Sequence, residues 1–344
     1  MPKNLSQKKL KKAFSLLELS IVILIISILI VGSMSASITA MNNAKYKVTR
    51  DRMAEIYKAM GNYLLTNKAL PCPASLADLK SSSPNYGISG TAAGACNGGA
   101  GVYVGGASSQ LAYGMVPVQT LGLNTDMAED GFGNRFTYVV AKAFTQPSVT
   151  IDDTTGFGRA PETGNLTVKE SLGSSVFQLN TNDAIFAIIS HGANKFGAFN
   201  SNSATQNAAS SDADEIANYG SSFGSGSVTL STYFVSSSVN SDAFDDVLFY
   251  KTRNTMMLDF NAMSLVVCKE ILSTTLPANT NNYYSITGSG SSFAWPQTYY
   301  NQVASSTTTC SSADPAYIST VTNPTKRCGA FGVWQAGVIS PCTN

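Results

Sequence analysis

The stretch KKAFSLLELSIVILIISILIVGS (Lys11–Ser33) decides how the rest of this chain is interpreted. Glu18 is the one charged residue in Phe14–Ala44, and Leu19–Val31 is almost wholly apolar. The residues before it include five lysines and no acid: Lys3, Lys8, Lys9, Lys11 and Lys12. A short basic segment of this kind followed by a long apolar run predicts a leader and a membrane-inserting helix.

The length of the apolar stretch Phe14–Val31 favours a transmembrane segment. The 18 residues of Phe14–Val31 form about 27 Å of helix at about 1.5 Å per residue, close to the ~30 Å of a bilayer core. A carboxylate at that depth costs about 2.5–3.5 kcal/mol, so Glu18 should have a partner or a function. The alternative is that Glu18 lies near the interface and reaches water.

The leader, the small Ala13, the aromatic Phe14 and Glu18 four residues later resemble the class III signal of type IV prepilins and type II secretion pseudopilins. The resemblance implies that prepilin peptidase cleaves between Ala13 and Phe14 and that Phe14 is then N-methylated. It also implies that Glu18 meets the terminal amine of a neighbouring subunit during assembly. The family usually has glycine at the position of Ala13.

Two other interpretations of the leader stay open. One is a secretory signal peptide cut near Ser37 or Ala40, whose apolar core would be unusually long and would contain Glu18. The other is an uncleaved membrane anchor.

The helical pattern continues beyond the apolar stretch Phe14–Val31. Apolar residues recur at helical spacing with polar residues between them: Met53, Ile56, Tyr57, Met60, Tyr63 and Leu64. The LPCPA segment (Leu70–Ala74) follows, and its two prolines are expected to end the helix. We expect a leader over 1–13, a helix over 14–67 with a transmembrane segment at 14–36, and a β-rich globular domain over 68–344. The expected fold class is α+β: a long N-terminal helix, transmembrane in its first half and amphipathic in its second, packed on an antiparallel β-rich domain, as in the pilin fold that the resemblance implies.

Strands are predicted where short β-branched and aromatic runs lie between turn residues: Phe136–Lys142, Ala184–Ser190, Val228–Val235, Asp246–Thr252 and Phe331–Ile339. The segment Leu258–Leu272 is predicted to form a second helix. Four further segments, together with LPCPA, resemble a group of large proteobacterial prepilin-like proteins: MVPVQTLGL, DGFGNRFTYVV, SHGAN and DDVLFYKTR. The chain after about Thr255 shows no such resemblance.

Six cysteines follow the apolar segment: Cys72, Cys96, Cys268, Cys310, Cys328 and Cys342. None forms a CxxC pair and the chain has one histidine, which argues against zinc. An even count in an exported chain favours disulfides. Cys72–Cys96 is the preferred local pair. The other connectivities stay open, with Cys268 expected to bond one of the last three.

Asp242, Asp245 and Asp246 form a small acidic cluster. Oxygen ligands of this kind suit Ca²⁺, as in some pseudopilins, but the spacing is not that of an EF-hand. A solvated turn is the preferred interpretation, so no cofactor and no metal are expected and the three aspartates are weak calcium candidates. In the preceding DGFGN segment, Asp130 is expected to cap a turn, with a cation site as the lesser alternative.

Charge and motifs exclude several function classes. Without the five leader lysines, 17 basic residues stand against 21 acidic ones, so no nucleic-acid partner is expected. His191 follows a predicted core strand, and its neighbour Ser190 is badly placed to be a nucleophile that it activates. The chain has no P-loop. We therefore expect a protein that is not an enzyme.

The expected function is that of a structural subunit, a minor one, of a type IV pilus or a type II secretion pseudopilus. The resemblance implies three kinds of partner: other pilin or pseudopilin subunits, prepilin peptidase, and an inner-membrane assembly platform. It also implies a single-pass inner-membrane location with a periplasmic C-terminal domain, and a filament or cell-surface location after assembly. The alternative is a filament-tip adhesin whose C-terminal half, with Trp295 and Trp334, recognises a surface or substrate.

Overall fold

The structure is a computed structural model of the whole chain, and it divides the chain into two compact units, Met1–Lys47 and Val48–Asn344. The residues that it describes are 16–90, 96, 101–105, 110–147, 157, 164–171, 177–224, 227–231, 234–236, 244–262, 267–268, 271–275, 292–295, 298–299, 303–305, 307–309, 325–328 and 334–335. Side chains are described within residues 16–30 and 38–262 only, with gaps.

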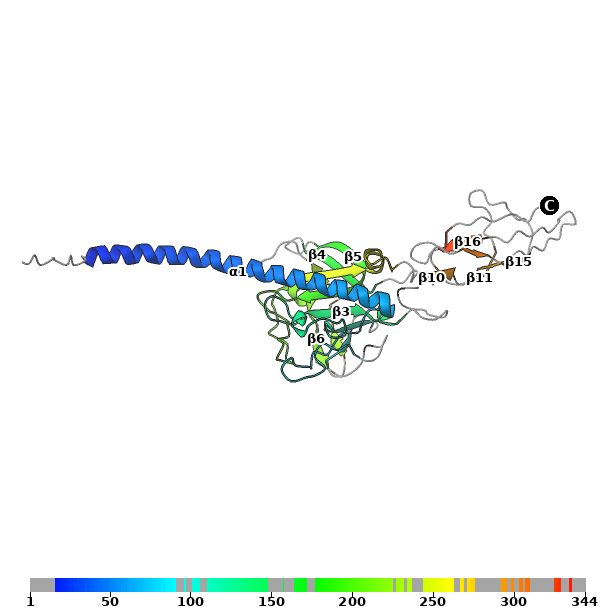
Figure 1. Cartoon of the computed structure of the whole chain (residues 1–344), viewed down its shortest axis with the longest axis horizontal. Coiled ribbons are helices and arrows are strands. Elements are labelled where there is room, and N and C mark those ends of the chain that lie inside the picture. Colours follow the sequence, from blue (N-terminus) through cyan, green and yellow to red (C-terminus); the bar gives the residue numbers. More distant parts are fainter. Residues whose placement is uncertain are drawn as a thin grey trace, which may run out of the picture. The chain divides into compact units, whose positions relative to one another are not determined.

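Helix α1 runs from Leu16 to Asn67 and belongs to both units (Figure 1). It ends at a left-handed cap, because Lys68 has a φ of +57° and its N–H donates to the carbonyl oxygen of Leu64 at 2.7 Å. Pro71 and Pro73 follow within the next residues and do not extend a helix.

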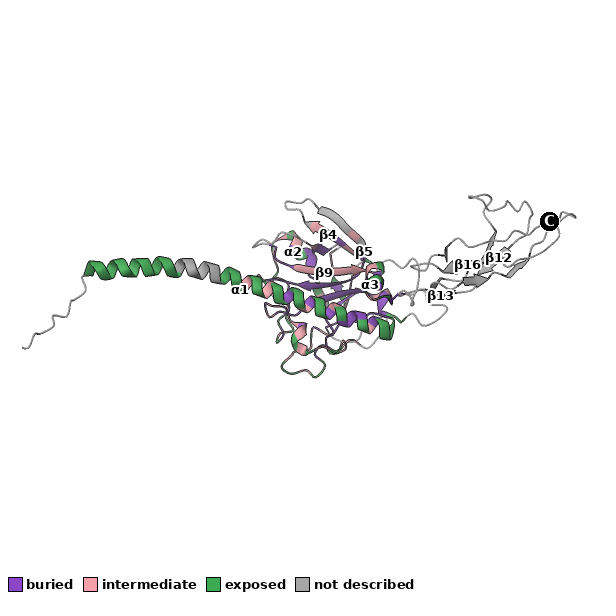
Figure 2. Cartoon of the chain, turned by 45° about the horizontal axis from the view of Figure 1, so that its top comes forward, coloured by how far each residue is buried: buried purple, intermediate pink, exposed green. Residues whose placement is uncertain are grey.

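Within the second unit, one face of α1 packs into the core. Met53, Ile56, Met60 and Leu64 are buried at spacings of three and four residues, which places them on one side of the helix. Figure 2 shows this alternation of buried and exposed residues along the ribbon of α1. The amphipathic pattern of the sequence therefore corresponds to a real interface with the rest of this unit.

Tyr57 connects this part of α1 to three other elements. Its ring lies 6.1 Å from that of Phe186, 5.1 Å from that of Phe249 and 4.9 Å from that of Phe260, measured between centroids. Its hydroxyl donates to the Asp259 carboxylate at 2.7 Å. Burial, together with this contact, raises the pKa of Tyr57 well above its usual value.

Gly61 brings α1 into close contact with Phe260. A Cβ at position 61 would overlap the Phe260 ring, so this position of the helix has to be glycine unless the ring moves. The gain of about 1 kcal/mol in helix propensity that alanine would bring is thus opposed by a steric conflict.

The main sheet has nine strands in the order β6-β7-β1-β2-β3-β5-β4-β8, with β9 also paired to β5. Their bounds are β1 Tyr103–Gly105, β2 Leu111–Met115, β3 Thr137–Ala141, β4 Leu166–Ser171, β5 Phe177–Ser190, β6 Ser221–Gly224, β7 Ser227–Thr229, β8 Phe234–Ser236 and β9 Val247–Thr252. The 14-residue strand β5 is central, because β3, β4 and β9 all pair with it in antiparallel fashion.

Continuous apolar sequence explains the middle of this sheet. All residues of β2 and β3 are buried, and so is every residue from Ala184 to Ile189 of β5. A strand that is covered on both faces needs no alternation of apolar and polar residues. β9 differs, since all six of its residues are only partly buried.

Short helices and three small sheets complete the description. The helices are the 3₁₀ turns η2 Thr125–Ala128 and η3 Lys142–Thr145 and the α-helices α2 Ala213–Asn218 and α3 Arg253–Asp259. The first small sheet pairs β10 Val267–Cys268 with β13 Thr298–Tyr299. In the second, β12 Ser292–Trp295 lies between β11 Ile271–Thr275 and β15 Thr307–Thr309. In the third, β16 Thr325–Cys328 lies between β14 Val303–Ser305 and β17 Trp334–Gln335.

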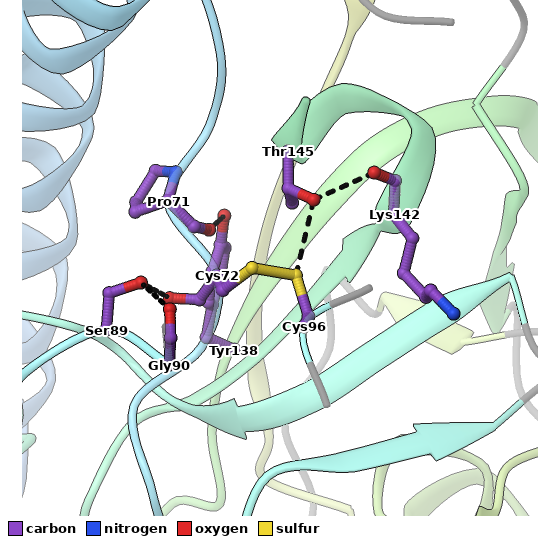
Figure 3. The surroundings of a disulfide bond; sticks show 8 residues. All are labelled: Pro71, Cys72, Ser89, Gly90, Cys96, Tyr138, Lys142 and Thr145. Carbon is purple, nitrogen blue, oxygen red and sulfur yellow. Dashed lines mark hydrogen bonds between the residues drawn. A yellow bond between two sulfur atoms is a disulfide. The ribbon is translucent and has the colours of Figure 1, made fainter. Parts of the chain in front are cut away.

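A disulfide fastens the segment after α1 to the core. Cys72 and Cys96 are bonded, with their Cα atoms 5.3 Å apart, and both residues are buried. Figure 3 shows two polar contacts on the Cys72 side of the bond: the Ser89 hydroxyl donates to the carbonyl oxygen of Cys72 at 2.9 Å, and the Tyr138 hydroxyl donates to that of Pro71 at 3.2 Å. The preferred pair of the sequence analysis is therefore bonded in the structure.

Several predicted elements differ from those observed. The segment Val228–Val235 is not one strand but parts of β7 and β8, which lie in different places in the sheet. The predicted helix Leu258–Leu272 is wrong: α3 ends at Asp259, and β10 and β11 begin within the predicted range. Asn261 has a φ of +50°, a left-handed conformation that stops the helix.

The predicted fold class is contradicted as well. The main sheet is mixed rather than antiparallel, since β1 pairs with β7 and β4 with β8 in parallel, and three further small sheets accompany it. A helix needs about 20 mostly apolar residues to cross a bilayer. In the described part of the chain, no helix is both long and apolar enough to do so. This finding overturns the predicted transmembrane segment over 14–36 and the single-pass inner-membrane location that depends on it.

We predict that replacing both Cys72 and Cys96 with alanine lowers the free energy of unfolding by about 2–4 kcal/mol, because the unfolded chain is no longer cross-linked. The bond joins residues 24 positions apart. Urea unfolding monitored by circular dichroism measures the change. An unchanged midpoint and slope would show that the bond does not constrain the unfolded state.

Candidate functional site

The first candidate site is the run of apolar side chains at the start of α1. Twelve of the fifteen residues from Leu16 to Ile30 are leucine, isoleucine or valine, and each of these is between 45% and 87% exposed (Figure 2). They occur on all sides of the helix, so the first unit presents no polar face over this length. We call Leu16–Ile30 the apolar run.

The polar residues of the apolar run add little polarity to its surface. The Ser20 hydroxyl donates to the carbonyl oxygen of Leu17 at 2.8 Å, and that of Ser27 donates to Ile23 at 2.7 Å. Serines that bond to the preceding turn in this way are compatible with apolar surroundings. Glu18 is exposed in the first turn of α1, where the helix dipole favours a negative charge.

Several predicted site residues lie outside the described residues. They are the cleavage-site pair Ala13 and Phe14, Asp242, and the cysteines Cys310 and Cys342. Cys268 lies in β10 and Cys328 in β16, but their side chains are likewise not described.

The second feature is a buried polar turn between α1 and β3. Asp130 accepts hydrogen bonds from the N–H groups of Phe132 at 2.8 Å and Asn134 at 2.9 Å, so it caps the turn as the sequence predicts. Its other oxygen accepts from the Ser190 hydroxyl at 2.7 Å. Burial raises the pKa of Asp130, and these donors act in the opposite direction. Ser190 is therefore a structural partner of Asp130.

The third feature is a cluster of buried acids, Glu215 in α2 and Asp245 and Asp246 just before β9, which we call the acidic cluster. One carboxylate oxygen from each residue can be chosen so that all three atoms lie within 4.8 Å of one another. Glu215 is 1% exposed, Asp245 6% and Asp246 3%. The preferred interpretation of Asp245 and Asp246 as part of a solvated turn is therefore wrong.

Local structure explains how the acidic cluster is assembled. Asp212 caps α2, because its side chain accepts from the N–H of Asp214 at 2.9 Å and that of Glu215 at 3.3 Å. The strand β9 starts at Val247 and pairs with the end of β5, which brings Asp246 beside the turn after Ser190. Three segments that are distant in the sequence thus meet at one end of the sheet.

The turn after β5 approaches the acidic cluster through its backbone. The N–H groups of Ala193 and Asn194 donate to Asp245 Oδ2 at 2.6 and 3.0 Å. Gly192 has a φ of +55°, and a Cβ at this position would overlap the Asp245 carboxylate. The glycine of the SHGAN segment is therefore required by both conformation and space.

His191 is buried next to the acidic cluster. Its Nε2 is hydrogen-bonded to Thr137 Oγ1 at 2.9 Å, and its Nδ1 lies 3.7 Å from Asp246 Oδ1. This second distance is too long for a hydrogen bond. Because the His191 side chain is fully buried, a substrate in solution has no access to it. The expectation that His191 is structural stays consistent with this position.

Charge repulsion and burial act together on Glu215. The pKa of this carboxyl is raised to about 7, chiefly by burial and also by the negative charges of Asp246 and Asp245. The Asn194 amide, which donates to Oε1, and the Ser210 hydroxyl act in the opposite direction and lower the pKa. The sequence analysis missed Glu215. The signal that could have found it is the capping pattern Asp212-Ala213-Asp214-Glu215, which marks a helix start in a polar region.

Comparison with known proteins does not identify this chain: no protein-family model, no curated protein and no solved structure matches it.

We predict that Gly192→Ala is more destabilising than Gly133→Ala. Both glycines have positive φ, +55° and +80°, which costs alanine about 1–2 kcal/mol. A Cβ at Gly133 meets nothing within 4 Å, whereas at Gly192 it overlaps Asp245. The extra loss at Gly192 should be about 1–3 kcal/mol, as for other overpacked sites. Urea unfolding of the two variants measures it, and equal losses would contradict the close approach to Asp245.

Proposed function

We propose that this chain is a structural subunit, a minor one, of a type IV pilus or a type II secretion pseudopilus. The observation that carries the proposal is the apolar run of α1 with its single carboxylate, Glu18. A helix that is apolar all round is normally covered by other apolar surface. Burying each leucine or isoleucine contributes about 1.5–3 kcal/mol, so covering the apolar run is strongly favourable.

The proposed cover is the same run in neighbouring subunits. Identical helices can pack along one another into a bundle, since each contributes the same apolar side chains. Glu18 would be costly to bury without a positive partner. The free amine of a mature chain that begins at Phe14 has the required charge, and it lies four residues before the position of Glu18 in the sequence. Pairing the two groups between subunits would fix the axial register of the bundle.

Processing and assembly require further partners. Under this proposal prepilin peptidase cleaves between Ala13 and Phe14, and an assembly platform adds the subunit to a filament of other pilins or pseudopilins. The protein acts by packing and not by catalysis. The alternative of a tip adhesin rests on the C-terminal region with Trp295 and Trp334, whose side chains lie outside the described residues, so no specific observation favours it.

The first prediction concerns processing. Mass spectrometry of the mature protein from cells that contain prepilin peptidase should show an N-terminal residue of Phe14 carrying an N-methyl group. Cells that lack the peptidase should yield a chain that still begins with the lysine-rich leader. A mature terminus near residue 40, or an intact leader in peptidase-containing cells, would refute the proposal.

The second prediction concerns assembly. Glu18→Ala should leave cleavage and the fold of the second unit unchanged, because Glu18 is exposed and lies in the first unit. Incorporation into sheared filaments, measured by quantitative immunoblotting, should fall by about tenfold or more, which corresponds to the loss of about 1.4 kcal/mol or more of pairing energy.

Glu55→Ala is the matched control. Glu55 is another exposed glutamate of α1, with its carboxylate 3.9 Å from the Lys58 amine. An exposed ion pair of this kind contributes little to stability. This variant should therefore enter filaments at the wild-type level. Equal incorporation of the Glu18→Ala and Glu55→Ala proteins would show that the Glu18 carboxylate is not an assembly contact.

A further inference from the structure

We propose that the acidic cluster of Glu215, Asp245 and Asp246 is a binding site for a divalent cation. One carboxylate oxygen from each residue can be chosen within 4.8 Å of the others, and all three residues are buried. Mutually close carboxylates repel one another, and each is costly to remove from water without a positive partner. A bound cation would offset both effects.

The hydrogen bonds of the acidic cluster leave one oxygen of Glu215 and one of Asp246 without a donor in the described part of the chain. Glu215 Oε1 accepts from the Asn194 amide, and Asp246 Oδ2 accepts from the Asn218 amide at 2.9 Å. The second oxygens of these two residues, Oε2 and Oδ1, accept no hydrogen bond from the described part of the chain. Each carboxylate is thus held in position through one oxygen and has the other available as a ligand.

Among the described residues, neither Glu215 nor Asp246 forms an ion pair with a lysine or arginine. The charges that act on Glu215 are those of the two aspartates, and both are negative. Buried carboxylates in proteins are ordinarily paired with cationic side chains or coordinated to metals. Coordination to a cation is the compensation that we propose for Glu215 and Asp246.

His191 supplies a second, independent observation. Its side chain is fully buried, and its Nε2 is already bonded to Thr137. Its Nδ1 has no hydrogen-bond partner among the described residues and lies 3.7 Å from Asp246 Oδ1. A buried polar nitrogen without a partner is unfavourable. An ion in the cluster, or a water bound to that ion, would provide the missing contact.

The ligand atoms indicate the class of ion. Carboxylate oxygens suit hard cations such as Ca²⁺, Mg²⁺ and Mn²⁺ rather than thiolate-preferring metals. Three protein carboxylates at one ion suit Ca²⁺, because Ca²⁺ accepts six to eight oxygen ligands in flexible geometry, whereas Mg²⁺ usually keeps several waters and takes one or two carboxylates. Calcium is therefore the expected preference.

The test uses the full-length protein after treatment with EDTA. Calorimetric titration with CaCl₂ should show one ion per chain, and the midpoint of thermal unfolding should rise with CaCl₂ concentration, since a ligand that binds the folded state stabilises it. MgCl₂ should give a smaller rise. A larger response to MgCl₂ would overturn the preference for calcium, and no response to either salt would overturn the site.

Glu215→Gln separates a ligand from a structural residue. The glutamine keeps the size of the side chain but lacks the charge, so calcium affinity should fall by about tenfold or more, as changes around metal sites commonly do. In EDTA the same variant should be at least as stable as the wild type, because it removes one of three mutually repelling acids. Glu55→Gln, at an exposed position of α1, should respond to calcium like the wild type. A Glu215→Gln protein with wild-type calcium affinity would overturn the proposal, and so would one that is less stable than the wild type in EDTA.

Discussion

The packing of Tyr57 against the sheet is the contact on which the second unit depends. One ring touches aromatic side chains of β5, β9 and the end of α3, and its hydroxyl bonds a residue 202 positions away in the sequence. The amine of Lys251 lies 5.0 Å from the ring centroid and also contacts Asp259 at 2.8 Å. Aromatic contacts of this kind contribute about 0.5–1.5 kcal/mol each beyond burial. Loss of this ring would therefore loosen α1, β9 and α3 together.

The same long-range assembly explains the polar interior. β5 ends at Ser190, which hydrogen-bonds to Asp130, and the next residue, His191, lies beside the acidic cluster. Ser190 completes the hydrogen bonds of Asp130, while His191 is left with one nitrogen that no described residue contacts by hydrogen bonding. Structure and proposed ion binding thus converge on the end of one strand.

The two units differ in how their apolar residues are covered. In the second unit, the apolar face of α1 is buried by the chain itself. In the first unit, the apolar run is exposed along the described helix. The second unit is therefore stabilised within the chain, and we propose that the first unit gains stability by association with other subunits. This difference is the basis of the proposed role as a filament subunit.

The sequence by itself determined the features that depend on local pattern. Helical spacing placed Met53, Ile56 and Met60 on one face, the prolines after Asn67 marked the end of α1, and the β-branched run before Ser190 marked a buried strand. The Cys72–Cys96 disulfide could also be predicted as a local pair, because only 24 positions separate the two cysteines. These features follow from backbone geometry and from residues close in the chain.

Only the tertiary structure decided the rest. The parallel pairs β1–β7 and β4–β8 join segments whose partners no local pattern specifies. The segment after Asp259 contains apolar residues at spacings that suit either a helix or strands, and strand pairing decided the outcome. Asp245 and Asp246 read as surface residues in the sequence, yet they are buried because β9 pairs with β5 and brings them to Glu215. The acidic cluster exists only through that pairing, since its members come from segments that meet in space and not along the chain.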